Sequence, residues 1–122
     1  MRRPGAWAPW VILCFVATGH AVKVVDGDTF DAALRIWSTV TVHERVRVYG
    51  VDTPELKGET KDAAVAAAAF TQAWLARGAF DLRTCGRDSF GRVLGVISRS
   101  GDGGVLAQDL IAAGHGVPYR AK

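Results

Sequence analysis

The fold is decided around residues 39–51, which read TVTVHERVRVYGV. Valines alternate there with polar neighbours, a two-residue period typical of a strand with one buried face. These valines are Val40, Val42, Val46 and Val48. The strand is expected to stop before Thr53-Pro54, because proline lacks the amide hydrogen that a strand needs. A half-buried strand needs partners, so the rest of the chain must supply a sheet.

Four more runs have the β-branched and apolar composition of short strands and are bounded by turn-forming residues. They cover residues 22–26, 30–36, 80–84 and 93–97. The first of them ends in Asp26-Gly27-Asp28, which favours a tight turn. We therefore expect five strands in all.

Two helices are expected. The first covers residues 60–77, with Thr60 as its N-cap and Gly78 at its end. Its apolar stripe is predicted to face a sheet and consists of Val65, Ala69, Ala73, Phe70 and Trp74. The second helix covers residues 105–113 and stops at Gly114. Three strands, a helix, two strands and a helix predict a mainly β, α+β domain: a five-stranded OB-fold barrel with two packed helices.

The N-terminal residues have the layout of a secretory signal peptide. Arg2 and Arg3 precede the uncharged, mostly apolar stretch AWAPWVILCFVA at residues 6–17, and small residues follow. We expect a signal at residues 1–21, with cleavage after Ala21 or, as the second choice, after Gly19, and one domain at residues 22–122. An uncleaved anchor stays open, although the run is short for a bilayer span. A lipoprotein attached at Cys14 is disfavoured by Leu13, a bulky residue.

Composition allows a single domain and says little about partners. The chain has 122 residues, of which 49% are hydrophobic, and a formal net charge of +3. Such a mild charge means that any binding of phosphates must depend on locally placed cations. With Cys14 in the expected signal, Cys85 would be alone, so neither an internal disulfide nor a zinc site is expected.

Three short segments carry candidate chemistry. They are Asp26-Gly27-Asp28-Thr29, the stretch from Arg47 to Glu55 with its acidic Asp52-Thr53-Pro54-Glu55 corner, and Asp88-Ser89-Phe90-Gly91-Arg92. Each alone could be an ordinary turn. The three segments together, in this order on an OB-like strand pattern, indicate a functional site far more specifically than any one of them.

The segments VVDGDTF, RVRVYGVDTPEL, DSFGRVLGVI and LIAAGHGVPY resemble the staphylococcal nuclease (thermonuclease, micrococcal nuclease) family, from Val24 to about Tyr119. The resemblance implies a five-stranded OB barrel and a Ca²⁺-dependent endonuclease. Such an enzyme hydrolyses DNA and RNA with low sequence specificity and leaves 3′-phosphate ends.

By this resemblance, Asp28 and Asp52 would be carboxylate ligands of one Ca²⁺, and the backbone carbonyl of Thr53 would be a third ligand. Asp26 would support the metal site from nearby. Ca²⁺ is a hard cation that takes six to eight oxygen ligands. The set would therefore leave positions for water and a phosphate oxygen.

Three further residues would be catalytic by the same resemblance. Glu55 would orient or activate the attacking water. Arg47 and Arg92 would hold the scissile phosphate and stabilise the negative charge that gathers on it.

Phe90 and Tyr119 would bind substrate. The chain departs from the family's type member at Ser89 and Phe90, which replace a basic residue and a tyrosine, and the family's third, C-terminal helix is not expected here. Weaker substrate binding is the expected consequence.

The resemblance and the export signal together predict a monomer in the periplasm or outside the cell, with no stable membrane association after cleavage. Two other functions remain open. The barrel could be a catalytically weak or inactive nucleic-acid-binding module, or an accessory protein of the cell envelope.

Overall fold

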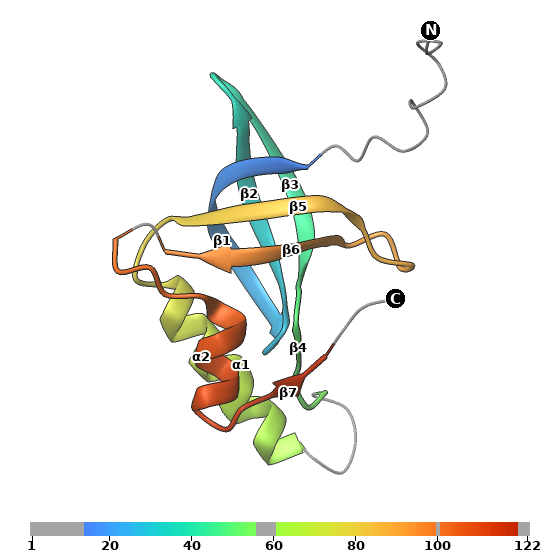
Figure 1. The fold of residues 1–122 in the computed structure, drawn as a ribbon, viewed down its shortest axis with the longest axis vertical. Helices are drawn as coiled ribbons and strands as arrows, with labels where there is room; N and C mark the ends of the chain where they lie inside the picture. The colour runs from blue at the N-terminus through green and yellow to red at the C-terminus, as the bar shows by residue number, and fades with distance from the viewer. Residues whose placement is uncertain (1–13, 56–60, 100, 120–122) are drawn as a thin grey trace, which may run out of the picture.

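The computed structural model describes residues 14–55, 61–99 and 101–119. Five strands in this part close a barrel in the order β1-β2-β3-β6-β5, and β5 returns to β1 (Figure 1). They are β1 (Phe15–Asp26), β2 (Thr29–Trp37), β3 (Val40–Val48), β5 (Phe80–Arg87) and β6 (Val93–Ser98). β3 and β6 pair in parallel, and the other pairs are antiparallel. The predicted five-stranded, OB-like barrel is confirmed.

Two helices pack beside one end of the barrel, α1 (Lys61–Leu75) and α2 (Leu106–Ala112) (Figure 1). α1 contacts β1 and α2, while α2 also contacts β6 and β4. A separate two-stranded sheet pairs β4 (Val51–Asp52) with β7 (Val117–Pro118). The expectation of two packed helices is confirmed, and no helix in the described ranges is long and apolar enough to cross a bilayer.

The barrel interior is filled by apolar side chains from every barrel strand. Phe30 and Phe80 meet edge to face with ring centroids 5.4 Å apart. The other fully buried large apolar residues of the described chain are Val46, Val48, Val51, Leu82, Ile97, Leu106 and Leu110. The core thus runs through the barrel into the face that α2 covers.

The strand predicted for residues 39–51 is divided in two. β3 ends at Val48, and Tyr49-Gly50 turns the chain before β4 begins at Val51. Gly50 has φ +91°, a left-handed backbone conformation that strongly favours glycine. The alternation of valines therefore predicted one continuous strand, where the structure has two strands joined by a turn.

The predicted stripe of α1 is only partly confirmed: Trp74 is buried and Phe70 packs against the core, but the other three residues face solvent. Val65 is half exposed, and Ala69 and Ala73 are exposed as well. The helix buries Ala64, Ala67, Thr71, Trp74 and Leu75. The small side chains on this face allow α1 to approach the β1–β2 turn closely. The expected N-cap, Thr60, lies outside the described residues.

The prediction that the first strand begins at Val22 is also wrong. β1 begins at Phe15, and all of the β1 residues that pair with β5 lie within residues 15–19. A Cβ on Gly19 would lie 2.7 Å from the Leu34 side chain and 2.9 Å from Phe80, so the backbone there packs directly against the core. The residues that close the barrel therefore fall inside the stretch that resembles an export signal.

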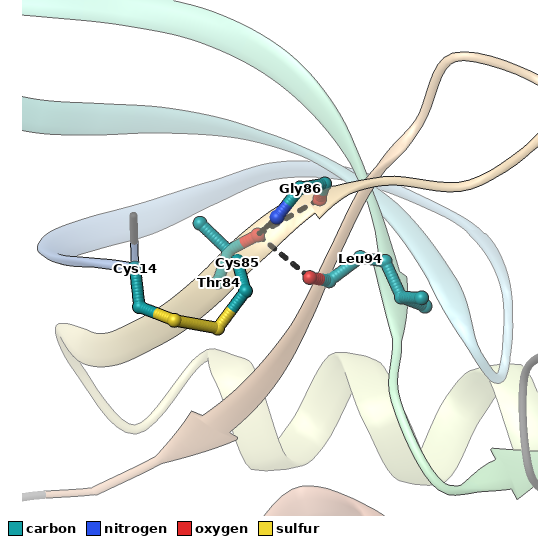
Figure 2. Close-up of a disulfide and its surroundings, with 5 residues drawn as sticks. All are labelled: Cys14, Thr84, Cys85, Gly86 and Leu94. Carbon is teal, nitrogen blue, oxygen red and sulfur yellow. Dashed lines mark hydrogen bonds between the residues drawn. A yellow bond between two sulfur atoms is a disulfide. The ribbon is translucent and has the colours of Figure 1, made fainter. Parts of the chain in front are cut away.

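A disulfide joins Cys14, just before β1, to Cys85 on β5 (Figure 2). The expectation that Cys85 has no internal partner is therefore wrong. The pairing Phe15↔Thr84 already places the two chain segments side by side, so the disulfide extends the β1–β5 ladder. It closes a separation of 71 residues along the sequence.

Removal of residues 1–21 is expected to abolish cooperative folding, because it deletes the whole β1–β5 ladder and leaves both edges of the sheet open. The matched control is a chain that begins at Cys14. Thermal unfolding followed by circular dichroism should show one sharp transition for the control and none for the shorter chain. A cooperative transition in the chain that begins at Val22 would show that the barrel closes without these residues.

The Cys14→Ser variant should be less stable than the unchanged protein by about 2–4 kcal/mol without reductant, because the disulfide restricts the unfolded chain. Urea unfolding measures this difference. In excess reductant the two proteins should become nearly equal in stability. A difference that persists after reduction would instead assign the effect to packing of the Cys14 side chain.

Candidate functional site

A pocket of about 550 Å³ opens on the barrel where the three candidate segments meet. It contains eight of the nine site residues expected from the sequence: Asp26, Asp28, Arg47, Asp52, Glu55, Phe90, Arg92 and Tyr119. The ninth, Thr53, lies directly behind Asp28 and donates its backbone N–H to that carboxylate at 3.0 Å. The pocket wall also includes Arg87, Asp88, Ser89 and Leu94.

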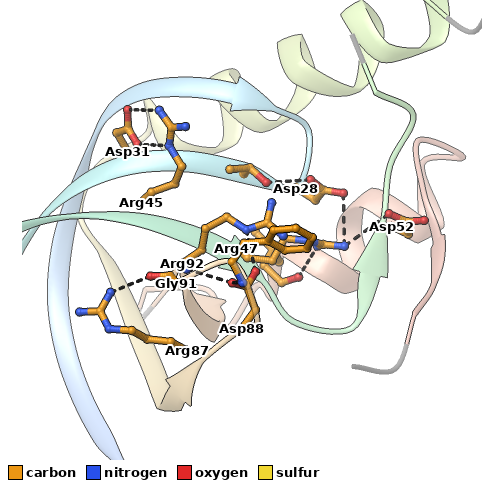
Figure 3. Close-up of polar contacts among 12 residues, drawn as sticks. Asp28, Asp31, Arg45, Arg47, Asp52, Arg87, Asp88, Gly91 and Arg92 are labelled. Carbon is orange, nitrogen blue, oxygen red and sulfur yellow. Dashed lines mark hydrogen bonds and ion pairs between the residues drawn. The ribbon is translucent and has the colours of Figure 1, made fainter. Parts of the chain in front are cut away.

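Arg47 lies at the centre of this site, one residue before the end of β3, and only 8% of its surface is exposed. Its Nη1 donates to the carbonyl oxygens of Val48 and Val51, both at 2.7 Å. Its Nη2 lies 3.5 Å from Asp28 Oδ2 and 3.4 Å from Asp52 Oδ1 (Figure 3). One buried guanidinium therefore fixes two carboxylates that are 24 positions apart in the sequence.

The two carboxylates differ in exposure. Asp28 is buried, and it accepts hydrogen bonds from the Thr29 hydroxyl and from the backbone N–H of Thr53, both at 3.0 Å. The Asp52 side chain is 56% exposed and faces the pocket. Asp28 is thus held rigidly, whereas Asp52 keeps oxygen lone pairs open to the pocket.

The turn that carries Asp28 is held from behind by helix α1. The Thr71 hydroxyl donates to the backbone oxygen of Gly27 at 2.5 Å. A Cβ on Gly27 would lie 2.9 Å from both Ala67 and Thr53, so only glycine fits at this position. The backbone N–H of Val48 donates to the Asp28 carbonyl at 2.8 Å and joins the turn to the end of β3.

The donor chemistry of this site fits a hard cation. Asp28 and Asp52 each have an oxygen within 3.5 Å of the same nitrogen, so a single positive centre already lies between them. In the described ranges, no group of three or more His, Cys, Asp or Glu side chains could hold a metal. The expected set is smaller, because it combines two carboxylates with the Thr53 carbonyl, and oxygen ligands of this kind suit Ca²⁺.

The second arginine of the site is held by a residue to which the sequence analysis gave no role. Asp88 Oδ2 accepts from Arg92 Nε at 2.6 Å (Figure 3). The other oxygen, Oδ1, accepts from the backbone N–H groups of Phe90 and Arg92, each at 2.9 Å. Asp88 therefore organises the whole β5–β6 turn, and an aspartate four positions before the arginine is the signal that could have indicated it.

The aromatic residues lie over the cations. The Arg92 guanidinium carbon is 5.2 Å from the centre of the Phe90 ring, and the Arg47 guanidinium carbon is 5.4 Å from the Tyr119 ring. Phe90 is 81% exposed and Tyr119 is 47% exposed. Both rings thus border the pocket with faces that solvent or a ligand can reach.

Comparison with protein-family models and with curated proteins finds no match to this chain. The candidate site therefore rests on its residues and their geometry.

The pKa of Asp88 is lowered from its ordinary value of 3.8. Burial raises it, but the hydrogen bonds from Arg92 and Phe90 together outweigh burial. Because the folded-state pKa is depressed, the ion pair stabilises the protein fully above pH 3.8, and this stabilisation is lost as the pH falls through the folded-state pKa.

The Asp88→Asn variant should accordingly be less stable than the unchanged protein at pH 7, by about 1–2 kcal/mol. The difference should shrink as the pH falls below 3.8, the ordinary pKa of the carboxyl, and approaches the folded-state value. Urea unfolding at several pH values measures it. A difference that stays constant from pH 7 to the acid limit would mean that the charge of Asp88 contributes nothing.

Proposed function

We propose that this chain is a Ca²⁺-dependent nuclease of the staphylococcal nuclease type that hydrolyses phosphodiester bonds of DNA and RNA with low sequence specificity. One observation carries the proposal: Asp28 and Asp52 share one guanidinium in a pocket that also contains Glu55 and Arg92. The motif resemblance from Val24 to Tyr119 and the OB-like barrel support the same function.

Asp28, Asp52 and the backbone carbonyl of Thr53 would hold the Ca²⁺, with Asp26 nearby. The ion would bind a phosphate oxygen, neutralise part of its charge and make a bound water more acidic. The rigid hydrogen bonding of Asp28 supports this role, because a ligand fixed in advance loses little freedom when the metal binds.

Arg47 and Arg92 would bind the scissile phosphate. Arg47 is anchored through Nη1, and Arg92 is anchored through Nε by Asp88. No partner among the described residues takes the two terminal nitrogens of Arg92, which suits the planar fork that grips two phosphate oxygens. Preorganised cations of this kind stabilise the extra charge of the transition state more than the ground state.

Glu55 would orient or deprotonate the attacking water from its exposed position in the pocket wall. The water oxygen bonds to phosphorus, the bond from phosphorus to the 5′-oxygen breaks, and the leaving oxygen takes a proton. The products are a 3′-phosphate end and a 5′-hydroxyl end. Phe90 and Tyr119 would pack against nucleotide bases on either side of this chemistry.

The proposal includes export of a monomer to the periplasm or the medium. The Cys14–Cys85 disulfide supports export, since disulfides persist mainly in oxidising compartments. Residues 14–21 belong to β1 or to this disulfide, so cleavage after Gly19 or Ala21 would remove part of the closed barrel.

The purified protein should cleave single-stranded DNA and RNA in millimolar Ca²⁺ and stop when EGTA is added. The Arg92→Ala and Glu55→Ala variants should each lose about 10²–10³-fold in rate, because each lacks a group that acts on the transition state. Gel electrophoresis of labelled substrates measures the rates. Arg35→Ala is the matched control, because Arg35 is exposed on β2 and does not line the pocket.

A protein that binds nucleic acid but shows no chelator-sensitive cleavage would refute the nuclease proposal and favour the binding module. In that case Arg92→Ala and Glu55→Ala would change affinity alone.

A further inference from the structure

A second groove of about 400 Å³ lies beside the candidate site, on the outer wall of the barrel. Its lining comes from β5, from β6 and from the corner after β3: Tyr49, Arg83, Cys85, Gly86, Arg87, Leu94, Gly95 and Val96. Arg87 and Leu94 line both this groove and the site pocket. The two hollows are therefore neighbours that share one wall.

The groove combines an aromatic ring with two cations. Tyr49 is 41% exposed, and its backbone N–H donates to the Gly95 carbonyl at 2.8 Å, which fixes the base of its side chain on β6. Arg83 has no ion-pair partner in the described ranges. Arg87 pairs with Glu44 at 2.8 Å and donates to the Gly91 carbonyl, so it forms a fixed boundary between the two hollows.

Both arginines line the same groove, and the β5 strand is irregular between them. The β5–β6 register shifts between Thr84 and Gly86, so that Arg83 lies opposite Val96 and Arg87 lies opposite Val93. The Thr84 hydroxyl lies 2.7 Å from the Leu94 carbonyl and accepts from the Gly86 N–H at 3.2 Å (Figure 2). Bulges of this kind redirect side chains on one strand. The neighbouring Cys85 forms the disulfide, which ties this irregular segment to the start of β1.

We propose that this groove binds, in a single-stranded substrate, the nucleotide next to the two that flank the cleaved bond, with its base stacked on Tyr49 and its phosphate on Arg83. The inference rests on the proposed function, because the shared wall is what places the groove on the path of a strand held in the site. A stacking ring beside a cation is the common design for sequence-independent binding of single strands. A base in a duplex is already stacked on its neighbours, so the groove selects unpaired substrate.

The test compares Tyr49→Ala and Arg83→Ala with the unchanged protein. The ligand is a fluorescent oligodeoxynucleotide of about twelve nucleotides, which is long enough to occupy both the site pocket and the groove. Binding is measured by fluorescence anisotropy in EGTA, where no cleavage is expected. Each variant should raise Kd about tenfold, and Arg83→Ala should reduce the slope of log affinity against log salt by about 0.7. Tyr49→Phe should keep near-normal affinity, since it retains the ring.

Cleavage with Ca²⁺ provides the second readout. KM for the longer oligonucleotide should rise about tenfold in both variants, whereas kcat and the hydrolysis of a dinucleotide should stay unchanged, because a dinucleotide does not need the groove. Arg35→Ala is again the matched control, since it removes the same charge from β2 outside both hollows. Thermal unfolding of each variant checks that the barrel is intact.

Three results would overturn the inference. These are unchanged Kd in both folded variants, equal losses on the dinucleotide and the longer strand, or an unlabelled duplex that competes as well as a single strand. A protein that binds the strand in EGTA through Tyr49 and Arg83 but cleaves nothing in Ca²⁺ would support the groove as a binding site and refute the proposed nuclease activity. Cleavage in Ca²⁺ that is unchanged in both variants would support the nuclease activity and refute the groove as a binding site.

Discussion

The buried guanidinium of Arg47 is the interaction on which this end of the structure depends. A charge removed from water is costly unless it is paired and hydrogen-bonded, and here two backbone carbonyls and two carboxylates surround it. Each of these partners requires a particular piece of backbone. The chain must turn at Gly50 so that the Val51 carbonyl faces back toward β3. The β1–β2 turn must pass close enough to bring in Asp28.

The same requirement explains why α1 has a small residue, Ala67, where it meets the β1–β2 turn. The β1–β2 turn can approach Arg47 only while α1 supports it from the other side, and the contact of Gly27 with Ala67 and Thr71 provides that support. A larger residue at Ala67 would displace the turn and, with it, Asp28. Ala67 thus has a local cause at the site, whereas the exposed alanines of α1 are accounted for by the high helix propensity of alanine.

Structural features that depend on local sequence could be predicted, whereas features that depend on strand pairing across the barrel could not. The strand alternation and the three charged segments are local, and they predicted the barrel and eight residues of one pocket. The run around Cys14 and Gly19 is different, because a short apolar stretch that ends in small residues has the composition of both an export signal and a barrel strand. Only the pairing with β5 separates the two readings, since it places Cys14 beside Cys85 and requires a residue without a side chain at Gly19. The stripe of α1 was only partly predicted for a similar reason: alanines occupy most of the helix faces, so hydrophobic periodicity could not show which alanines are buried.

The distribution of buried polar groups argues that this end of the barrel is built to bind a charged ligand. The buried polar or charged residues of the described chain are Asp28, Thr29, Arg47, Thr53 and Thr71. The first four surround one point, and the fifth holds the turn that carries Asp28. A barrel selected for stability alone could close this end with apolar side chains, since well-packed hydrophobic replacements of buried ion pairs are often neutral or stabilising. The chain instead concentrates its buried polarity beside an exposed carboxylate, two fixed arginines and two exposed rings. Such a local departure from the rules of a stable core is the pattern expected where structure serves binding or chemistry.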